Sequence, residues 1–347
     1  MVSKLLGVQN IIMMFPYFTA AFILLIIGKI VFQKTTSYCI DDELTEKDNP
    51  AMGILLGGYL LGLALAISTT ITGQGIGDVA SLKAGFMTIG VFGACSIVLL
   101  RLSVIVMDKL ILSKFSVHKE ITKDQNIGVA LVTAGSCVAS GLMIAGVMSG
   151  TSDSLLIGIR DMVAYWVLGQ VILVIGSKLF QKFTSYDDQK LLEGGDGVEV
   201  QNIPIGLLWC GFLIAQGIII KATLTGATSD LLRECMVTAA ASLVGLLLFA
   251  VIHVVTDRFL LPKSKISKEI AEDHNPAAGV VCGVAFVAIA LLLSPIVNPM
   301  TNGTAENVVE IVEVVEKPAA PVVAETPAPV EEVKVAAPVE PVKKQVE

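Results

Sequence analysis

Four asparagines are the residues whose type and spacing point most clearly to a local chemistry. Each stands just before a long apolar run, in the stretches DNPAMG, DQNIGVA, VQNIPIG and DHNPAAG. An asparagine in that place accepts hydrogen bonds from the free N–H groups of the first helical turn, and proline suits the position that follows. The pattern predicts four helix caps and leaves open whether these positive helix ends converge on an anion-attracting vestibule. The four residues are Asn49, Asn126, Asn202 and Asn275.

Arg101 is a second candidate because it lies well inside an apolar run. A charge inside a membrane span either extends to the interface or faces protein or water, where it marks a pathway or a partner. Two interpretations therefore stay open: a side chain that reaches the interface, and an asymmetric contact with an ion or a lipid headgroup. The matching position in the second half of the chain is Ala250, so Arg101 does not belong to a symmetric site.

Catalytic and metal-binding motifs have little support in the chain. It contains no Ser-His-Asp set, no His-Glu-x-x-His motif and no glycine-rich phosphate loop. The 3 histidines are scattered, and the 6 cysteines form no Cys-x-x-Cys pair, which favours small membrane-buried hydrophobes. We therefore predict no enzyme activity, no cofactor and no metal site.

The elements that must position these residues are membrane helices. Of the 347 residues 54% are hydrophobic and 16% are charged, and the mean hydropathy is +0.77. A soluble globular protein carries about 25% charged residues, so a soluble enzyme, a nucleic-acid binder and a disulfide-stapled secreted domain are excluded. Runs of about 20 apolar residues predict eight transmembrane helices. They cover residues 11–32, 51–72, 84–107, 127–148, 162–180, 203–222, 234–255 and 276–297.

The basic residues divide unequally between the two sides of these spans. The connections after the first, third, fifth and seventh spans carry 13 lysines and arginines, and the other side carries five. Lysine and arginine resist translocation, so the richer side is predicted to be cytoplasmic. Both chain termini are then expected on the outer side, which in a Gram-negative bacterium is the periplasm.

An internal duplication is the strongest pattern in the chain. Ile27–Tyr38 reads IGKIVFQKTTSY and Ile175–Tyr186 reads IGSKLFQKFTSY, with eight of twelve positions identical. A second ungapped match pairs Val106–Asn126 with Val255–Asn275. The chain is therefore predicted to be two parallel four-helix repeats related by a pseudo-two-fold axis along the membrane normal. The recurring asparagines indicate that each repeat is itself a doubled helical hairpin.

A charged connection, an acid-Asn-small entry and a glycine-rich apolar hairpin resemble the domain-of-unknown-function 350 family. The resemblance covers residues 10–297 as two tandem copies. It implies a bacterial inner-membrane protein with no known cofactor and no established activity. With the spacing above, it predicts an all-α integral membrane protein of eight helices. The expected parts are a first repeat at 1–150, a second at 151–299 and a disordered Ala/Pro/Val/Glu-rich tail at 300–347.

Two function classes remain open after this reading. In the first, the protein is a non-catalytic membrane scaffold or envelope-homeostasis factor whose loops and tail are docking surfaces. In the second, it is a passive ion or small-solute channel with a path along the pseudo-two-fold axis. The absence of matched ionisable groups inside the spans favours the first class. The expected partner is the lipid bilayer, and no nucleic-acid partner is expected. An envelope protein bound through the tail and a homo-oligomer are both left open.

Overall fold

The computed structural model describes residues 2–72, 79–150, 154–194, 201–224, 231–255, 258 and 264–298. All secondary structure in these ranges is helical. The predicted tail at 300–347 lies outside the described residues, so its expected disorder stays a prediction.

The described chain is four successive hairpins of the same construction. Each hairpin has a long helix, a short helix of six residues at the connection, and a second long helix. A π-helical turn, Met107–Ile111, extends the first helix of the second hairpin. The hairpins are α1 (Val2–Lys34), α2 (Ile40–Thr45) and α3 (Pro50–Ile71); α4 (Val79–Val106), α5 (Val117–Thr122) and α6 (Ile127–Met148); α7 (Leu155–Phe183), α8 (Asp188–Glu193) and α9 (Ile203–Leu224); and α10 (Leu231–Val255), α11 (Ile266–Ala271) and α12 (Pro276–Val297).

Seven of the long helices in the described ranges are long and apolar enough to cross a membrane. They are α1, α3, α4, α6, α7, α9 and α12, which makes the chain a multi-pass membrane protein. Helix α10 takes the place of the predicted span 234–255, but its qualifying apolar stretch is shorter, Cys235–Leu248. The eighth crossing therefore stays a prediction.

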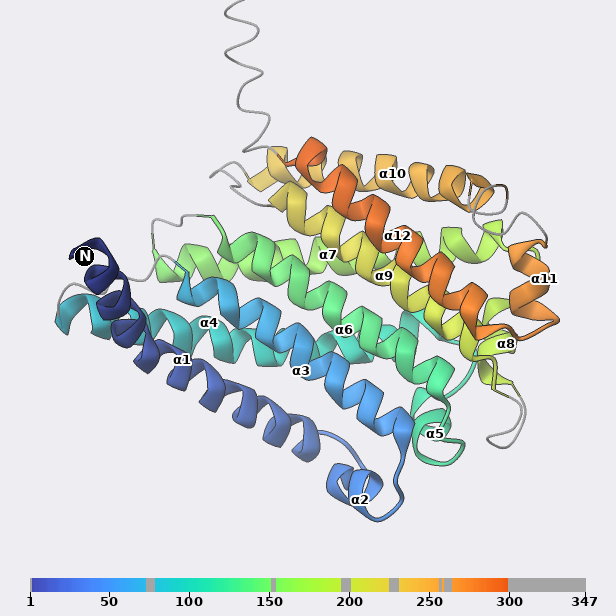
Figure 1. Ribbon diagram of the computed structural model, residues 1–347, viewed down its shortest axis with the longest axis horizontal. Coiled ribbons are helices and arrows are strands. Elements are labelled where there is room, and N and C mark those ends of the chain that lie inside the picture. Colours follow the sequence, from blue (N-terminus) through green and yellow to red (C-terminus); the bar gives the residue numbers. More distant parts are fainter. Residues whose placement is uncertain are drawn as a thin grey trace, which may run out of the picture. The chain divides into compact units, whose positions relative to one another are not determined.

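The second long helices of the hairpins, α3, α6, α9 and α12, lie side by side in chain order, and this row is the centre of the fold (Figure 1). The first long helices, α1, α4, α7 and α10, form a second layer in which each contacts the next. Helix α6 has neighbours on both sides in the row and also contacts α4 and α7 of the second layer. As a result, 83% of its apolar span is buried. The short helices α2, α5, α8 and α11 all lie on the same side of the row, at the N-terminal ends of its helices (Figure 1).

Backbone-to-backbone contact through small residues holds the row together. A Cβ atom added to Gly58 on α3 would overlap the backbone of Ala134 on α6. A Cβ on Gly135 of α6 would lie 2.9 Å from the Cα of Cys210 on α9, and the same overlap recurs between α9 and α12. Without a hydrophobic driving force between helices in lipid, such close approach supplies the van der Waals contact that stabilises them.

The arrangement of these contacts corrects the predicted pseudo-two-fold axis. In each pair the glycine nine residues after one capping asparagine meets the residue eight after the next asparagine. Ala134 of α6 faces α3, whereas Gly135 of α6 faces α9. A two-fold axis would bring equivalent helices of the two repeats together, α6 with α12 or α3 with α9, but the repeats meet through α6 and α9. The repeats are therefore stacked in a row, and the path along a two-fold axis expected for a channel has no counterpart in it.

Candidate functional site

The four asparagines occupy the corner where each short helix turns into the second long helix. The Asn49 Oδ1 atom accepts a hydrogen bond from the Met52 N–H at 3.1 Å and so caps α3. Its Nδ2 atom donates to the Glu43 carboxylate at 2.8 Å, while the Asn49 N–H donates to the Glu43 carbonyl at 2.9 Å. Asp48, just before the cap, adopts a left-handed conformation with φ of 48°, which turns the chain sharply.

The same corner is built in the second and fourth hairpins. Asn126 caps α6 and donates to Glu120 at 2.9 Å, and Asn275 caps α12 and donates to Glu269 at 2.8 Å. The glutamate stands six residues before the asparagine in each case. These glutamates are not among the candidate residues that the sequence analysis singled out. The fixed spacing was the signal that could have found them.

A second hydrogen bond links each of the first three corners to the following hairpin. The Nδ2 atom of Asn49 donates to the Ile121 carbonyl in α5 at 2.8 Å. Asn126 reaches the Leu192 carbonyl in α8 at 2.7 Å, and Asn202 reaches the Ile270 carbonyl in α11 at 2.8 Å. We call these four capped corners with their links the asparagine row. The four residues therefore lie in a line and not around a common opening, and the first three are only 1–2% exposed.

The third hairpin departs from the corner pattern. Leu191 is the fourth residue of α8, the position that a glutamate occupies in the other three short helices. Asp188 and Gln189 are buried at the start of α8. The Gln189 carbonyl oxygen Oε1 accepts from the Lys114 N–H at 3.0 Å. The Lys114 ammonium pairs with the Asp187 carboxylate at 2.7 Å. These contacts join the second hairpin to the third, at the junction of the two sequence repeats.

Asp188 makes the stability of this junction depend on pH. Burial raises the pKa of Asp188 to about 7 from an ordinary value of 3.8, so the folded protein holds this proton where the unfolded chain has lost it. The free energy of unfolding should therefore fall as the pH rises from about 4 to about 7. Asp188→Asn should remove that loss, as measured by thermal unfolding midpoints between pH 5 and 8.

The neighbouring Asp187 is a suitable control because its pKa is shifted in the opposite direction. The Lys114 ammonium lowers the pKa of Asp187, so its contribution to stability is present at neutral pH and lost only under acidic conditions. Asp187→Asn should leave the slope between pH 5 and 8 as in the wild type. An unchanged slope in Asp188→Asn would contradict the assignment of the buried proton to Asp188.

Arg101 lies in the α4 span and reaches back to the end of α1. Its guanidinium carbon stands 4.3 Å from the centre of the Phe32 ring, a cation–π distance. The Nη2 atom donates to the Thr35 carbonyl at 3.3 Å, just beyond the last residue of α1. The positive charge thus satisfies a carbonyl at a helix C-terminus, where the helix dipole favours a cation. The structure therefore places Arg101 in a contact between helices and not in the asparagine row.

A buried polar cluster joins α4, α6 and α7 inside the membrane-spanning region. The Ser103 hydroxyl accepts from the Trp166 indole at 3.0 Å and from the Gln170 amide at 3.2 Å. The same Gln170 amide donates to the Ser140 hydroxyl at 2.8 Å. This cluster is not singled out by the sequence analysis, because contacts between distant helices leave no local signal. The cluster fixes the two layers against each other.

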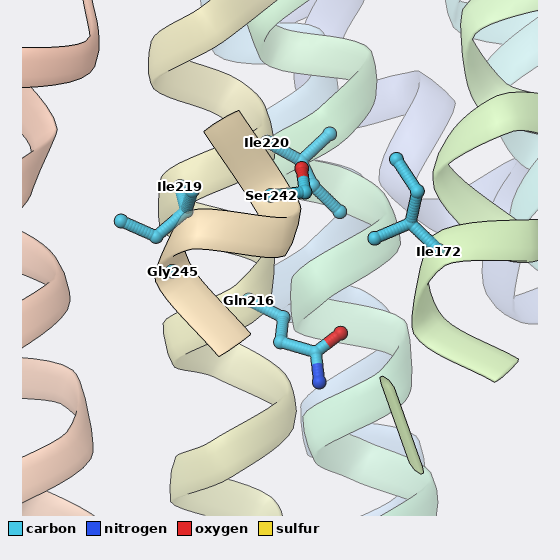
Figure 2. A pocket seen from close by; sticks show the side chains of 6 residues that line it. All are labelled: Ile172, Gln216, Ile219, Ile220, Ser242 and Gly245. Carbon is cyan, nitrogen blue, oxygen red and sulfur yellow. The ribbon is translucent and has the colours of Figure 1, made fainter. Parts of the chain in front are cut away.

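Gln216 has no such partners in the described part of the chain. Its side-chain nitrogen and oxygen are both buried without a hydrogen bond, and so is the hydroxyl of Ser242. Both residues line a cavity of about 10 Å³ between α7, α9 and α10, with Ile172, Ile219, Ile220 and Gly245 (Figure 2). That volume is close to the least that holds one water molecule, which needs polar partners of this kind.

The contrast between these two glutamines predicts opposite effects of the same substitution. Gln216→Met should raise the free energy of unfolding by about 1 kcal/mol, since it removes a buried amide whose hydrogen-bonding groups are unmet. Gln170→Met should lower it by about 1 kcal/mol, since it removes bonds to two serines. Thermal unfolding in detergent measures both. Equal destabilisation by the two substitutions would show that the Gln216 side chain is also hydrogen-bonded in the folded protein.

Within the described residues, no three histidine, cysteine, aspartate or glutamate side chains gather as a metal site requires. The polar side chains described above form helix caps, carboxylate–amide pairs and interhelical links.

The comparisons with known proteins agree with the internal duplication. A family model described as Domain of Unknown Function (DUF350) matches residues 5–148 and again residues 154–297. Two tandem matches confirm both the predicted resemblance and the predicted two copies. No curated protein and no solved structure matches the chain.

Proposed function

The chain belongs to the DUF350 family as two tandem copies, and we propose that it is a non-catalytic scaffold or homeostasis factor of the bacterial inner membrane. The observation that carries this proposal is the close packing of the helices in the row. Gly62 and Gly141 press the α3 and α6 backbones together, and Ala139 and Gly217 do the same for α6 and α9. Backbones in direct contact leave no space for a solute between them, which supports a structural role over a channel.

The docking surfaces of this scaffold are its connections and its tail. The excess of lysine and arginine on the short-helix side supports a cytoplasmic position for α2, α5, α8 and α11. Both termini are then periplasmic, which gives the segment 300–347 access to other envelope proteins. Its Ala/Pro/Val/Glu composition suits a segment that remains extended until a partner binds it.

Flux through liposomes tests the choice between scaffold and channel. The full chain is reconstituted, and ion and small-solute flux is measured at both voltage polarities beside a known pore as positive control. The proposal expects membranes as tight as protein-free liposomes. Flux that rises with the amount of folded protein would overturn it in favour of the channel.

A second experiment tests the docking role directly. A photo-crosslinking amino acid is placed singly at tail positions such as Val322 and Val330 in the native host, and adducts are compared with those of the chain ending at residue 299. The proposal expects adducts with the same envelope protein from several tail positions. Absence of adducts at every position would remove the tail from the proposal.

A further inference from the structure

The row of helices has two open ends, and each end exposes half of an interface that occurs three times inside the chain. Every internal pair joins a donor face on one helix to an acceptor face on the next. The donor face carries the residue nine positions after the capping asparagine, and the acceptor face carries the residue eight positions after it. Within the row, α3 contacts α6 through its donor face only, and α12 contacts α9 through its acceptor face only.

The open acceptor face of α3 is shaped like its covered counterparts. Gly57 stands eight positions after Asn49, where the following hairpins have Ala134, Cys210 and Gly283. Each of those three residues lies against the preceding helix of the row. By contrast, the place of a Cβ on Gly57 has no atom within 4 Å, and the residue is exposed. The helix therefore presents an exposed glycine with open space around it at the height where its successors receive a neighbour.

The open donor face of α12 is apolar and exposed at the matching height. Val284 stands nine positions after Asn275 and is 60% exposed, where Gly58, Gly135 and Gly211 stand in the earlier helices. A valine is larger than those glycines, and Gly57 has no side chain to oppose it. A Cβ at this place in α9, on Gly211, would overlap the backbone of Gly283. Val284 therefore sets α12 farther from a neighbouring helix than the helices inside the row, and the open space around Gly57 receives its side chain.

A polar link is open at the same two ends. Among the described residues the Asn275 side-chain amide donates only to Glu269, whereas Asn49, Asn126 and Asn202 each also reach the carbonyl of the next short helix. The acceptors are Ile121, Leu192 and Ile270, and the equivalent residue of the first hairpin is Leu44 in α2. In the described part of the chain, no side chain donates to the Leu44 carbonyl. The unused donor and the unused acceptor complement each other.

We propose that copies of this chain associate head to tail in the membrane plane, with α12 of one copy against α3 of the next. Asn275 of the first copy donates to the Leu44 carbonyl of the second, and Val284 packs over Gly57. All hairpins in the row point the same way, so a continued row keeps every copy in the same membrane orientation. A contact between two different faces leads to a row or ring of copies. This inference goes beyond the proposed function and does not depend on it.

The sharpest test exploits two exposed glycines that differ only in their place. Gly57 and Gly90 both have open space around a Cβ, so leucine at either position leaves the isolated chain intact. Gly90 lies on α4, outside the proposed contact. Association in liposomes is measured by single-molecule photobleaching at rising protein-to-lipid ratios, and folding by the thermal unfolding midpoint.

Gly57→Leu should lower the association constant at least about tenfold, because an overpacked interface loses its close approach. Gly90→Leu should associate as the wild type does, and both variants should unfold at the wild-type temperature or above. Equal association of the two variants would overturn the proposal, and so would a wild type that stays monomeric at every density.

Disulfide crosslinking tests the direction of the contact. Copies with Gly57→Cys are mixed with copies carrying Val284→Cys, both in a Cys39→Ser background because Cys39 is the exposed native cysteine among the described residues. A head-to-tail contact gives a crosslinked dimer only in the mixture. Crosslinking of Gly57→Cys copies with one another would indicate a symmetric dimer and overturn the proposal, as would no crosslink at all.

Discussion

Gly141→Ala is expected to prevent assembly of the helix row. A Cβ atom on Gly141 of α6 would overlap the backbone carbonyl of Gly62 on α3, and a Cβ on Gly62 would in turn overlap the backbone at Cys137. Neither obstacle is a side chain that can rotate away, so the two helices must separate. Overpacking of this kind costs about 3 kcal/mol or more, and a buried α6 has no room to shift.

The measurement compares Gly141→Ala with the same substitution at Gly57. Alanine is a better helix former than glycine by about 1 kcal/mol, so Gly57→Ala should leave the free energy of unfolding unchanged or raise it. Gly141→Ala should fail to give a monodisperse protein in detergent or should unfold at a much lower temperature. If the two variants unfolded at the same temperature, the α3–α6 contact would be looser than the structure has it.

Loss of the Asn126 side chain is the second large effect. Asn126 is 1% exposed, and its amide caps α6, binds the Glu120 carboxylate and links to the Leu192 carbonyl. Asn126→Ala removes all three contacts and leaves a buried carboxylate without the group that offsets its desolvation, which already raises the pKa of Glu120. The expected loss is about 3 kcal/mol or more in the free energy of unfolding.

Asn275 provides the matched control because it occupies the same corner at the end of the row. It caps α12 and binds Glu269, but both residues are partly exposed and the link to a following hairpin is absent within the described chain. Asn275→Ala should cost about 1 kcal/mol in the monomer, the ordinary value of a helix cap. Denaturant titration in mixed micelles measures both variants, and equal losses would refute the structural role of the interhairpin link.

Sequence patterns can point to these corners only where the chemistry is local. An asparagine before an apolar run is recognisable because its cap bond spans three residues, as in Asn49 to Met52. The bond from Asn49 to Ile121 crosses 72 residues and follows no local rule. The same holds for the cluster around Ser103, Trp166 and Gln170, whose members come from different hairpins.

The sequence alone determined the membrane class, the helical hairpins and the duplication, because apolar run length and repeated segments are properties of the chain itself. Only the tertiary structure decided how the hairpins assemble. Equal repeats inserted the same way up are compatible with either a two-fold pair or a continued row. The choice depends on which faces of α6 meet α3 and α9, and Ala134 and Gly135, adjacent in sequence, face opposite neighbours. Backbone approach within the folded row selects between the two arrangements, and small residues alone permit both.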